Sequence, residues 1–553
     1  MLRSHWFWPA LIAFGAWLAV ISALDPVGEY PANGDGPGLT LDEQFNVEQG
    51  VMMVDHLLAM DGPGFREWVD KLPDHPLLGR LWIGLAHEIA YLAFPPPGPS
   101  PPTISMTCAR TGSASAFAIL VFLIGWFGSR WYGQRAGIVA AISMVLMPRV
   151  FGHAHLASLE TCVNLTWCAT VLCLADFADR DRPPRWWQIV ALGVLLGLAL
   201  LTKIQAVLLP GPLGLWMIYR WRLRGLVAAV AWGLIGLAVF FVGWPWLWSD
   251  PLVRALNFFK SSSQRSAVSV WYFGTNYVDR DVPWHYPWVM FLTTVPLGLQ
   301  LLGFTGLKFG GLKSGAAGDA STNPKTPEYR EILLLSAILF PLVVFMIPGV
   351  AVYDGERLFL MVFPLWALFI GRGANWVAER WGSLRPQWLL RVSLGCFLVL
   401  QSYGLWAISP CHLSYYNLLV GGLRGADRLG LPVTYWGETM SRTFLRDVAA
   451  AVPAGGVVRF NPVVHSYQLA ELERRSVSLR DRSIHLLPYN TDGNLHPPYL
   501  LVFMRKDSLP DEFHHLPEGA ELAAGLWREG VLLAALFHFP QVVHVKPRPQ
   551  MRF

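Results

Sequence analysis

Two adjacent carboxylates stand at the start of the first long hydrophilic segment of this chain. Thr40 and Glu43 have the spacing of a capping box, in which each side chain binds a backbone N–H group at the start of a helix. Asp42 is not needed for that box, and a carboxylate of this kind can accept a proton from an incoming hydroxyl group. We therefore predict Asp42 as a general base, and Glu43 as either a capping residue or a second catalytic carboxylate.

A histidine follows in the same segment, within the stretch Asp74-His75-Pro76. Proline at a first helical position, with an acid just before it, is an ordinary helix start. A helix start is therefore one interpretation of this stretch, and a substrate contact made by His75 is the other.

A third candidate group comprises His153 and His155, which lie between two apolar runs, and Glu160, which lies at the start of the second of these runs. An acid inside a membrane or at its surface is energetically costly and is a functional candidate for that reason. His-x-His with a nearby Glu also offers ligand types that suit zinc, although the spacing identifies no fourth ligand. A divalent metal therefore stays open, and we assign no metal ligand.

Two basic residues complete the set of candidates. Lys203 lies at the end of an apolar run, and Arg357 lies at the end of the stretch Tyr353-Asp354-Gly355-Glu356-Arg357. Lys203, Tyr353 and Arg357 are candidate substrate-binding residues. Arginine suits a phosphate because its guanidinium presents a rigid fork of donors. The alternatives are snorkelling of Lys203 to the membrane surface and a local ion pair between Arg357 and the acids that precede it.

The elements that must position these residues are mainly α-helical and membrane-spanning. The chain is 53% hydrophobic and 15% charged, whereas soluble domains have about 25% charged residues. A helical span needs about 20 apolar residues. We predict about eleven spans in a transmembrane helical bundle, near 6–24, 106–127, 136–149, 157–177, 186–202, 204–219, 225–245, 286–307, 332–348, 357–371 and 388–409.

The placement of basic residues predicts the orientation of these spans. With a cytoplasmic N-terminus, the Lys and Arg residues fall in the short inner turns, as the positive-inside rule requires. They are spread over many turns, so the net charge of +5 does not indicate a nucleic-acid partner. We predict a multi-pass protein of a bacterial inner membrane with every long loop outside; a cleaved signal peptide is the alternative for the first run.

The hydrophilic segments carry their own secondary-structure signals. The loop at 25–105 predicts two surface helices, near 41–60 and 77–94. Beyond residue 409 the pattern changes to strand-like stretches at 456–460 and 499–503 and a helix-like stretch at 440–451. We therefore predict a transmembrane catalytic domain at 1–409 and a small soluble α/β domain at 410–553, outside the membrane.

Several short motifs follow one another in a recognisable order. They are Asp42-Glu43, His75-Pro76, Ala109-Arg110 at the start of the second apolar run, Glu160 at the start of the fourth, and Glu356-Arg357 before a late one. Over about residues 1–410 the pattern resembles the GT-C superfamily of membrane glycosyltransferases that use polyprenyl-phosphate sugars, in particular the protein O-mannosyltransferase and aminoarabinose-transferase branch (glycosyltransferase family 39 type). Two positions depart from the pattern, because the family usually has Asp where this chain has Glu160 and a second proline where it has Leu77.

The resemblance implies an integral-membrane enzyme that moves a sugar, with inversion, from a polyprenyl-phosphate donor to a hydroxyl group of a protein, lipid or glycan. The family resemblance requires no cofactor. A lipid-linked sugar, membrane lipid and a hydroxyl acceptor are the implied partners. The candidate residues are Asp42, Glu43 and Glu160 for catalysis, and His75, Arg110, His153, His155, Lys203, Tyr353 and Arg357 for substrate binding.

Two other classes of protein remain as alternatives. In a transporter or lipid flippase, charges inside the bundle mark a translocation path, but such proteins commonly contain inverted repeats, and no half-to-half symmetry is visible here. An inactive relative that serves as a binding scaffold through residues 410–553 is the second alternative.

Overall fold

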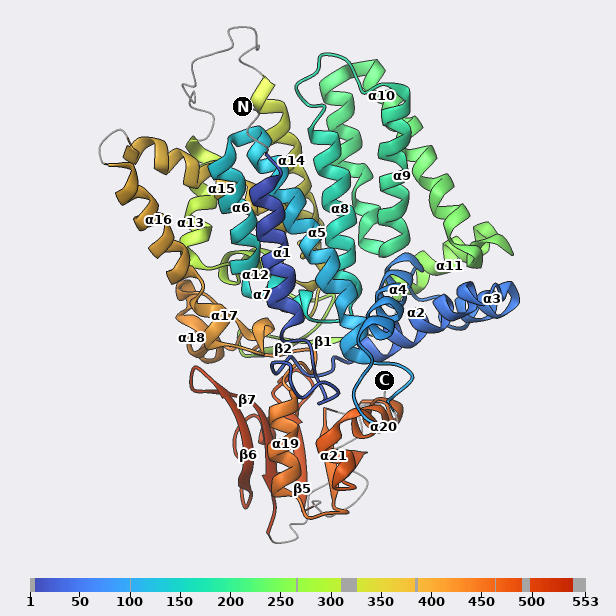
Figure 1. Cartoon of the computed structure of the whole chain (residues 1–553), viewed down its shortest axis with the longest axis vertical. Coiled ribbons are helices and arrows are strands. Elements are labelled where there is room, and N and C mark those ends of the chain that lie inside the picture. The colour runs from blue at the N-terminus through green and yellow to red at the C-terminus, as the bar shows by residue number, and fades with distance from the viewer. Residues whose placement is uncertain are drawn as a thin grey trace.

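The computed structural model describes residues 5–99, 101–264, 267–309, 326–382, 386–462, 464–489 and 498–540. It consists of a long helical bundle with a smaller sheet-containing region at one end (Figure 1). The bundle contains α1 (Phe7–Ile21), α5 (Met106–Tyr132), α6 (Gln134–Leu146), α7 (Pro148–Ala154), α8 (Leu159–Ala175), α9 (Trp186–Thr202), α10 (Pro210–Gly243), α12 (Tyr286–Thr293), α13 (Leu297–Phe309), α14 (Thr326–Val344), α15 (Val362–Gly382), α16 (Gln387–Gln401) and α17 (Tyr403–Ala407).

Helix α10 is a hairpin of two helices. Arg222 breaks it with a φ of +55°. A Cβ atom on Gly225 would lie 2.0 Å from the carbonyl oxygen of Met217, although eight residues of continuous helix span about 12 Å. The chain therefore reverses at the break, in the basic turn between the predicted runs 204–219 and 225–245.

Each predicted apolar run coincides with one or two helices, but the number of membrane spans is not fixed by this agreement. In the described part of the chain, three helices are long and apolar enough to cross a membrane: Met106–Tyr132, Ile204–Gly243 and Gln387–Ala407. The count rises to five if each bent pair, α6 with α7 (72°) and α12 with α13 (108°), forms one span. The figure of about eleven spans stays a prediction.

The basic turns meet at the end of the bundle away from the sheet (Figure 1). Acidic residues at the end of α8 and the start of α14 pair with arginines of neighbouring turns and helices, so these turns lie side by side. The ion pairs are Arg130 with Asp176, Arg330 with Asp179, Arg220 with Asp181, and Arg372 with Glu331.

The first long loop contains the two predicted helices, α2 (Glu43–Leu58) and α4 (Leu78–Ala93). They pack very closely, since a Cβ on Gly84 would lie 2.1 Å from the carbonyl oxygen of Gly50. A third helix, α3 (Gly62–Lys71), was not predicted. Its start is an ordinary one, because Asp61 accepts a hydrogen bond from the N–H of Gly64 and a proline lies in the first turn.

The long loop after α10 also contains regular structure. It consists of α11 (Pro251–Gln264) and a short antiparallel hairpin of β1 (Ser269–Tyr272) and β2 (Thr275–Val278). Residues 279–285 then lead to α12.

The region after α17 contains a five-stranded mixed sheet in the order β4-β3-β5-β7-β6. Its strands are β3 (Val457–Asn461), β4 (His485–Pro488), β5 (Tyr499–Phe503), β6 (Glu521–Arg528) and β7 (Val531–His538), and its helices are α18 (Gly422–Arg428), α19 (Arg442–Ala451), α20 (Ser466–Arg475) and α21 (Val477–Asp481). Strands β3 and β5 and helix α19 confirm the predicted stretches. One hydrophobic cluster contains Phe444 and Leu501 of this region together with Val47 of α2 and Leu159 of α8. The sheet region and the loop-side end of the bundle therefore share a core.

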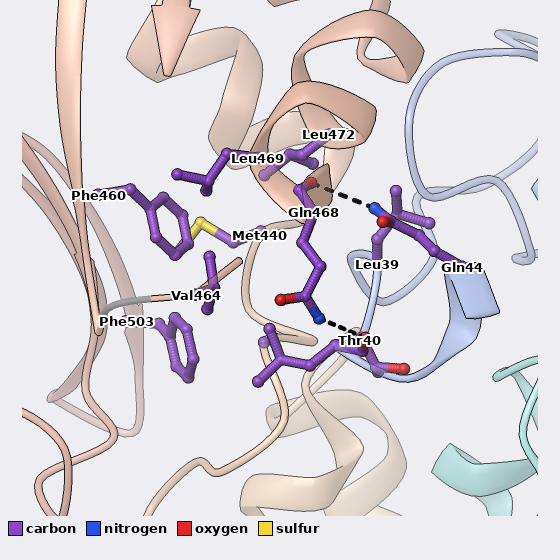
Figure 2. A pocket seen from close by; sticks show the side chains of 12 residues that line it. Leu39, Thr40, Gln44, Met440, Phe460, Val464, Gln468, Leu469, Leu472 and Phe503 are labelled. Atoms are coloured by element: carbon purple, nitrogen blue, oxygen red, sulfur yellow. Dashed lines mark hydrogen bonds between the residues drawn. The ribbon is translucent and has the colours of Figure 1, made fainter. Parts of the chain in front are cut away.

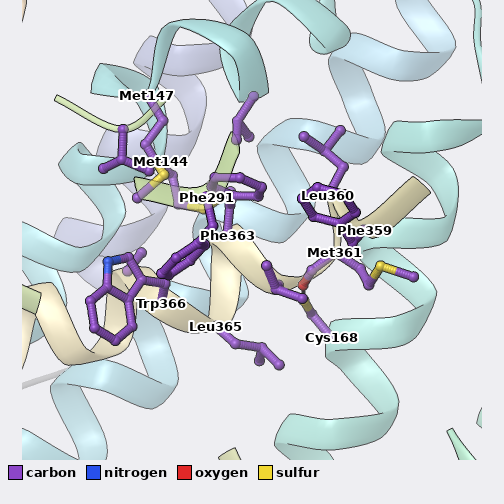
Figure 3. Close-up of a cluster of buried hydrophobic side chains, with 14 of the residues drawn as sticks. Met144, Met147, Cys168, Phe291, Phe359, Leu360, Met361, Phe363, Leu365 and Trp366 are labelled. Atoms are coloured by element: carbon purple, nitrogen blue, oxygen red, sulfur yellow. Dashed lines mark hydrogen bonds between the residues drawn. The ribbon is translucent and has the colours of Figure 1, made fainter. Parts of the chain in front are cut away.

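A second feature of the core fixes the segment that follows Arg357. Phe359, Leu360, Met361 and Phe363 are all buried, and they lie among side chains of several bundle helices, including Cys168 of α8 (Figure 3). The segment is thereby anchored in the bundle, which leaves Arg357 at a fixed place at its surface.

Candidate functional site

Four of the predicted residues come together at the end of the bundle that faces the sheet. Asp42 occupies the N-cap position of α2, Glu160 is the second residue of α8, Lys203 follows α9, and Arg357 begins the 3-10 turn Arg357–Phe359. These segments are far apart in the sequence. Their side chains nevertheless form one chain of ion pairs, which we name the charge cluster.

The buried carboxylate of Glu160 joins the two cations of the charge cluster. Its Oε1 accepts from Lys203 Nζ at 2.5 Å and from Arg357 Nε at 2.6 Å. The Nη2 of Arg357 also donates to Asp42 Oδ2. Arg357 therefore bridges the two carboxylates through different nitrogen atoms.

Exposure separates Asp42 from the rest of the charge cluster. Its side chain is 44% exposed, whereas those of Glu160, Lys203 and Arg357 are 2%, 5% and 11% exposed. Burial of Asp42 raises the pKa of its carboxyl, but the charge and hydrogen bond of Arg357, together with the charge of Lys203, hold the pKa below its usual range. Asp42 is thus an ionised carboxylate that an incoming molecule can reach.

A tryptophan from the region beyond the last apolar helix completes this arrangement. Trp436 Nε1 donates to Asp42 Oδ2 at 3.2 Å, and its ring lies 4.0 Å from the guanidinium carbon of Arg357. The sequence assigns Trp436 no role, because no local pattern separates its function from that of the other tryptophans in a chain that has 26 of them.

The segment just before Arg357 is held by acids on both sides of a tight turn. Asp354 pairs with Arg357 at 3.1 Å and with Arg505 at 3.3 Å. Glu356 is fully buried and pairs with Arg149 of α7 at 2.6 Å. Burial raises the pKa of Glu356, against the effect of Arg149. The local ion pair that was the alternative for Arg357 is therefore present, together with its contacts to the charge cluster.

Comparison with known protein families bears on part of this site. Residues 104–248 match the family described as dolichyl-phosphate-mannose-protein mannosyltransferase. Over this segment, the predicted resemblance to protein O-mannosyltransferases is confirmed. The matched segment contains Glu160 and Lys203, whereas Asp42, Arg357 and Trp436 lie outside it. No protein with a curated description matches the chain.

A comparison with solved structures finds matches at low identity. ArnT from Cupriavidus metallidurans bound to undecaprenyl phosphate is 15% identical over 96% of this chain and 97% of that one, with a TM-score of 0.47. Its apo form is 14% identical over the same shares, with a TM-score of 0.48. The oligosaccharyltransferase AglB from Archaeoglobus fulgidus, in complex with an inhibitory peptide and a dolichol-phosphate, is 9% identical over 90% of this chain and 69% of that one, with a TM-score of 0.45.

Two predicted residues lie apart from the charge cluster and pair with each other. Glu43 and Arg110 are both fully buried, and their side chains are joined by two hydrogen bonds of 2.7 and 2.8 Å. Glu43 also accepts from the N–H groups of Thr40 and Ala157. Arg110 donates to the carbonyl oxygens of Leu24, Pro37 and Gly38. The predicted capping box is only half formed, because Thr40 Oγ1 has no partner among the described residues and the N-cap residue of α2 is Asp42. The contacts of Glu43 and Arg110 favour roles in holding the loop, so we propose neither Glu43 for catalysis nor Arg110 for phosphate binding.

We expect the substitution Glu43→Gln to destabilise the protein by about 3–5 kcal/mol, because it leaves the buried Arg110 charge without its partner. Thermal unfolding of the purified protein in detergent measures this effect. The matched control is Glu48→Gln on the same helix. Glu48 accepts an exposed hydrogen bond from the hydroxyl of Tyr467, so this substitution should cost less than about 1 kcal/mol. Equal melting temperatures for the two variants would contradict a structural role for Glu43.

The histidines take different positions. His153 of α7 is fully buried beside Trp436, with ring centroids 5.5 Å apart, and neither ring nitrogen has a partner among the described residues. His155 bonds the carbonyl oxygen of Phe151 through Nδ1 and stacks on His412. Its contacts do not include the charge cluster. His75 lies half-buried in the turn before α4, and its Nε2 is 3.8 Å from Asp74 Oδ2. Tyr353 is half-buried next to Asp354.

A metal site was left open by the sequence. Among the described residues, no three His, Cys, Asp or Glu side chains gather in a way that could hold a metal ion. The charge cluster is instead balanced by its own two cations.

A small pocket is lined by Leu39, Thr40 and Leu41, the residues that precede Asp42 in the sequence (Figure 2). It is formed by the segment before α2 and by the region after α17, and Gln468 crosses it to donate to the carbonyl oxygen of Leu41 at 2.7 Å. Its lining residues are Leu39, Thr40, Leu41, Gln44, Gly437, Met440, Phe460, Val464, Gln468, Leu469, Leu472 and Phe503. The pocket shows that the two regions meet closely at this end of the bundle.

Proposed function

We propose that this membrane glycosyltransferase moves a sugar from a polyprenyl-phosphate donor to a hydroxyl acceptor at the charge cluster. One observation carries the proposal: a reachable carboxylate and two nearly buried cations lie in one network at a single end of an apolar bundle. A lipid phosphate at the membrane surface needs cations at that level, and the acceptor hydroxyl needs a base beside it.

In this proposal Asp42 is the general base. The acceptor oxygen forms a bond to the anomeric carbon of the sugar as the bond from that carbon to the phosphate oxygen breaks, with inversion of configuration. The acceptor proton passes to Asp42. Its exposed carboxylate is the member of the charge cluster that an acceptor can approach.

Arg357 and Lys203 would hold the phosphate leaving group. Breaking the bond adds a negative charge to the phosphate, and protonation of Asp42 removes one beside Arg357 at the same step. The total charge around Arg357 thus stays constant, while the ionic partner of the guanidinium changes from the Asp42 carboxylate to the phosphate. Arg357 and Lys203 would therefore stabilise the charge that develops on the phosphate more strongly in the transition state than in the ground state, which is the condition for catalysis.

Glu160 would act by holding both cations in place. It is almost fully buried and contacts Lys203 and Arg357 through one oxygen. A Glu at this position reaches further from the backbone than the Asp usual in the family, which suits a residue that must bridge two cations. His153, buried beside Trp436, and His75 remain candidates for contacts with the sugar or the acceptor.

The placement of the enzyme in a cell is also proposed. A bacterial inner membrane, with the charge cluster and residues 410–553 on the outer side, agrees with the basic turns at the opposite end of the bundle. The division into a domain at 1–409 and one at 410–553 stays a prediction.

The test uses purified protein in lipid nanodiscs, radiolabelled polyprenyl-phosphate mannose or aminoarabinose as donor, and a membrane and periplasmic extract as source of acceptors. A transferase releases free polyprenyl phosphate and moves the label to another molecule. A flippase instead moves intact donor across a vesicle membrane. Donor translocation without release of lipid phosphate would contradict the proposal, as would inertness toward every donor tested.

A further inference from the structure

We propose that Trp436 and Arg505 are positioning residues, which hold the base Asp42 and the phosphate-binding Arg357 in their working geometry. The proposal rests on the proposed function of these two residues. Both positioning residues belong to the region after the last apolar helix, so that region would be part of the active site.

Trp436 acts on both members of the pair with one side chain. Its indole N–H donates to Asp42 Oδ2 at 3.2 Å, and its ring face lies under the Arg357 guanidinium at 4.0 Å. The first contact favours the ionised carboxylate and fixes which way it points. The second is a cation–π contact, which orients a flat guanidinium. Trp436 is itself 1% exposed, so it works through these residues and not by touching a substrate.

The backbone around Trp436 is fixed to the segment that carries Asp42. The N–H of Leu41 donates to the carbonyl oxygen of Trp436 at 3.1 Å, and the N–H of Gly38 donates to that of Glu438 at 2.7 Å. The fully buried Glu438 side chain accepts from the N–H of Trp436 at 3.3 Å. A Cβ on Gly38 would lie 2.3 Å from the carbonyl oxygen of Met440, so the two segments touch. Trp436 is therefore held at a set distance from Asp42.

Arg505 provides a second connection, through Asp354. Asp354 lies between Arg505 and Arg357 and pairs with both. Arg505 is in turn held by a hydrogen bond to the carbonyl oxygen of Tyr435 at 2.6 Å and by Asp507 at 2.9 Å. The backbone φ of Asp354 is +55°, a region that Asp and Asn enter more readily than other non-glycine residues. Such a conformation costs free energy, and the ion pairs on both sides maintain it.

The charged groups that face Asp42 set the background for a test by pH. Arg357 and Lys203 favour its ionised form and Glu160 opposes it. His75 and His153 are the nearby titratable residues of the turn before α4 and of α7. Arg357 and His153 both contact the Trp436 ring. A substitution that keeps an aromatic ring at position 436 therefore changes these contacts least, and a shift in the pH profile then reports on the missing N–H donor.

The first test is Trp436→Phe, which keeps a ring under Arg357 and removes the N–H donor. The ionised form of Asp42 loses a hydrogen bond, so its pKa rises and the acid limb of the kcat profile moves up by about one pH unit. The matched control is Trp271→Phe, because the indole N–H of Trp271 has no partner among the described residues. An acid limb at the same pH in Trp436→Phe and the wild-type enzyme would overturn the role of Trp436, even if kcat fell.

The second test is Asp354→Asn, which suits the left-handed backbone and removes the charge between the two arginines. We expect KM for the lipid-phosphate donor to rise about 5- to 10-fold, with a smaller change in kcat. Arg505→Gln should do the same, and the double variant should be no worse than either single one, because both act through one ion-pair chain. Additive effects, or unchanged KM values, would overturn the role of Arg505. This test also decides the proposal if Trp436→Phe does not fold.

The outcome for the proposed function is read separately. If the wild-type protein transfers no sugar, the proposed function fails, and if Asp42→Asn retains full transfer activity, the proposed role of Asp42 as the base fails, whatever the positioning variants do. If Asp42→Asn is inactive while Trp436→Phe and Asp354→Asn behave like the wild-type enzyme, only the positioning proposal fails.

Discussion

The substitution Asp42→Asn is expected to lower kcat by about 10²- to 10⁴-fold, the usual contribution of a general base. Asparagine has the same shape and still accepts a hydrogen bond from Trp436, but it takes no proton from an acceptor hydroxyl. The measurement is the rate of sugar transfer from a radiolabelled lipid-phosphate donor in nanodiscs, at equal protein and with an unchanged melting temperature.

The matched control for this substitution is Asp55→Asn. Asp55 lies on the same helix, α2, and is exposed away from the charge cluster. It should transfer sugar at the wild-type rate. Turnover within a few-fold of wild type in Asp42→Asn would remove Asp42 from the role of base.

The substitution Arg357→Gln has the second-largest expected effect, a fall of about 10²- to 10³-fold in kcat/KM for the donor. Arg357 is the residue that both the leaving phosphate and Asp42 would use in the proposed step, and glutamine supplies no charge to either. Because Arg357 lowers the pKa of Asp42, its removal should also move the acid limb of the pH profile upward. Initial rates as a function of donor concentration and pH check both effects.

Arg357→Lys serves as the comparison for that prediction. Lysine keeps the positive charge but lacks the fork that reaches Glu160, Asp42 and Asp354 through three nitrogens. Compared with Arg357→Gln, we expect Arg357→Lys to bring the pH profile closer to that of the wild type than it brings the transfer rate. A donor dependence identical to wild type in Arg357→Gln would show that the phosphate binds elsewhere.

Much of the helical bundle could be predicted from hydrophobic runs alone. Apolar residues next to lipid or in a helical core must lie in segments whose backbone groups are bonded internally, so the runs coincide with the helices of the bundle, α1, α5 to α10 and α12 to α17. Sequence reasoning missed α3, whose signal is a single Asp61 cap with a following proline. It also left the number of spans open, because α12 and α13 bend by 108° in the middle of one predicted run.

The candidate site was predicted by residue type and corrected by contacts. Asp42 and Glu43 are neighbours of the same charge, but only one of them reaches the charge cluster. Residue type does not distinguish them: Glu43 lies one position further along a helix turn, where its side chain points into the core towards Arg110. Arg110 was likewise a candidate substrate-binding residue by its type, and the structure buries it with Glu43.

The sequence by itself determined which segments are helical, which end of each helix carries acids or arginines, and which residue types could move a proton or hold a phosphate. These are local properties, set by side-chain polarity and by the bonding needs of the backbone. Only the tertiary structure decided that Arg357 reaches back more than 300 residues to Asp42, and that Trp436 contacts both of them. Contacts of that range depend on how the helices and the following sheet pack together, and no local pattern records them.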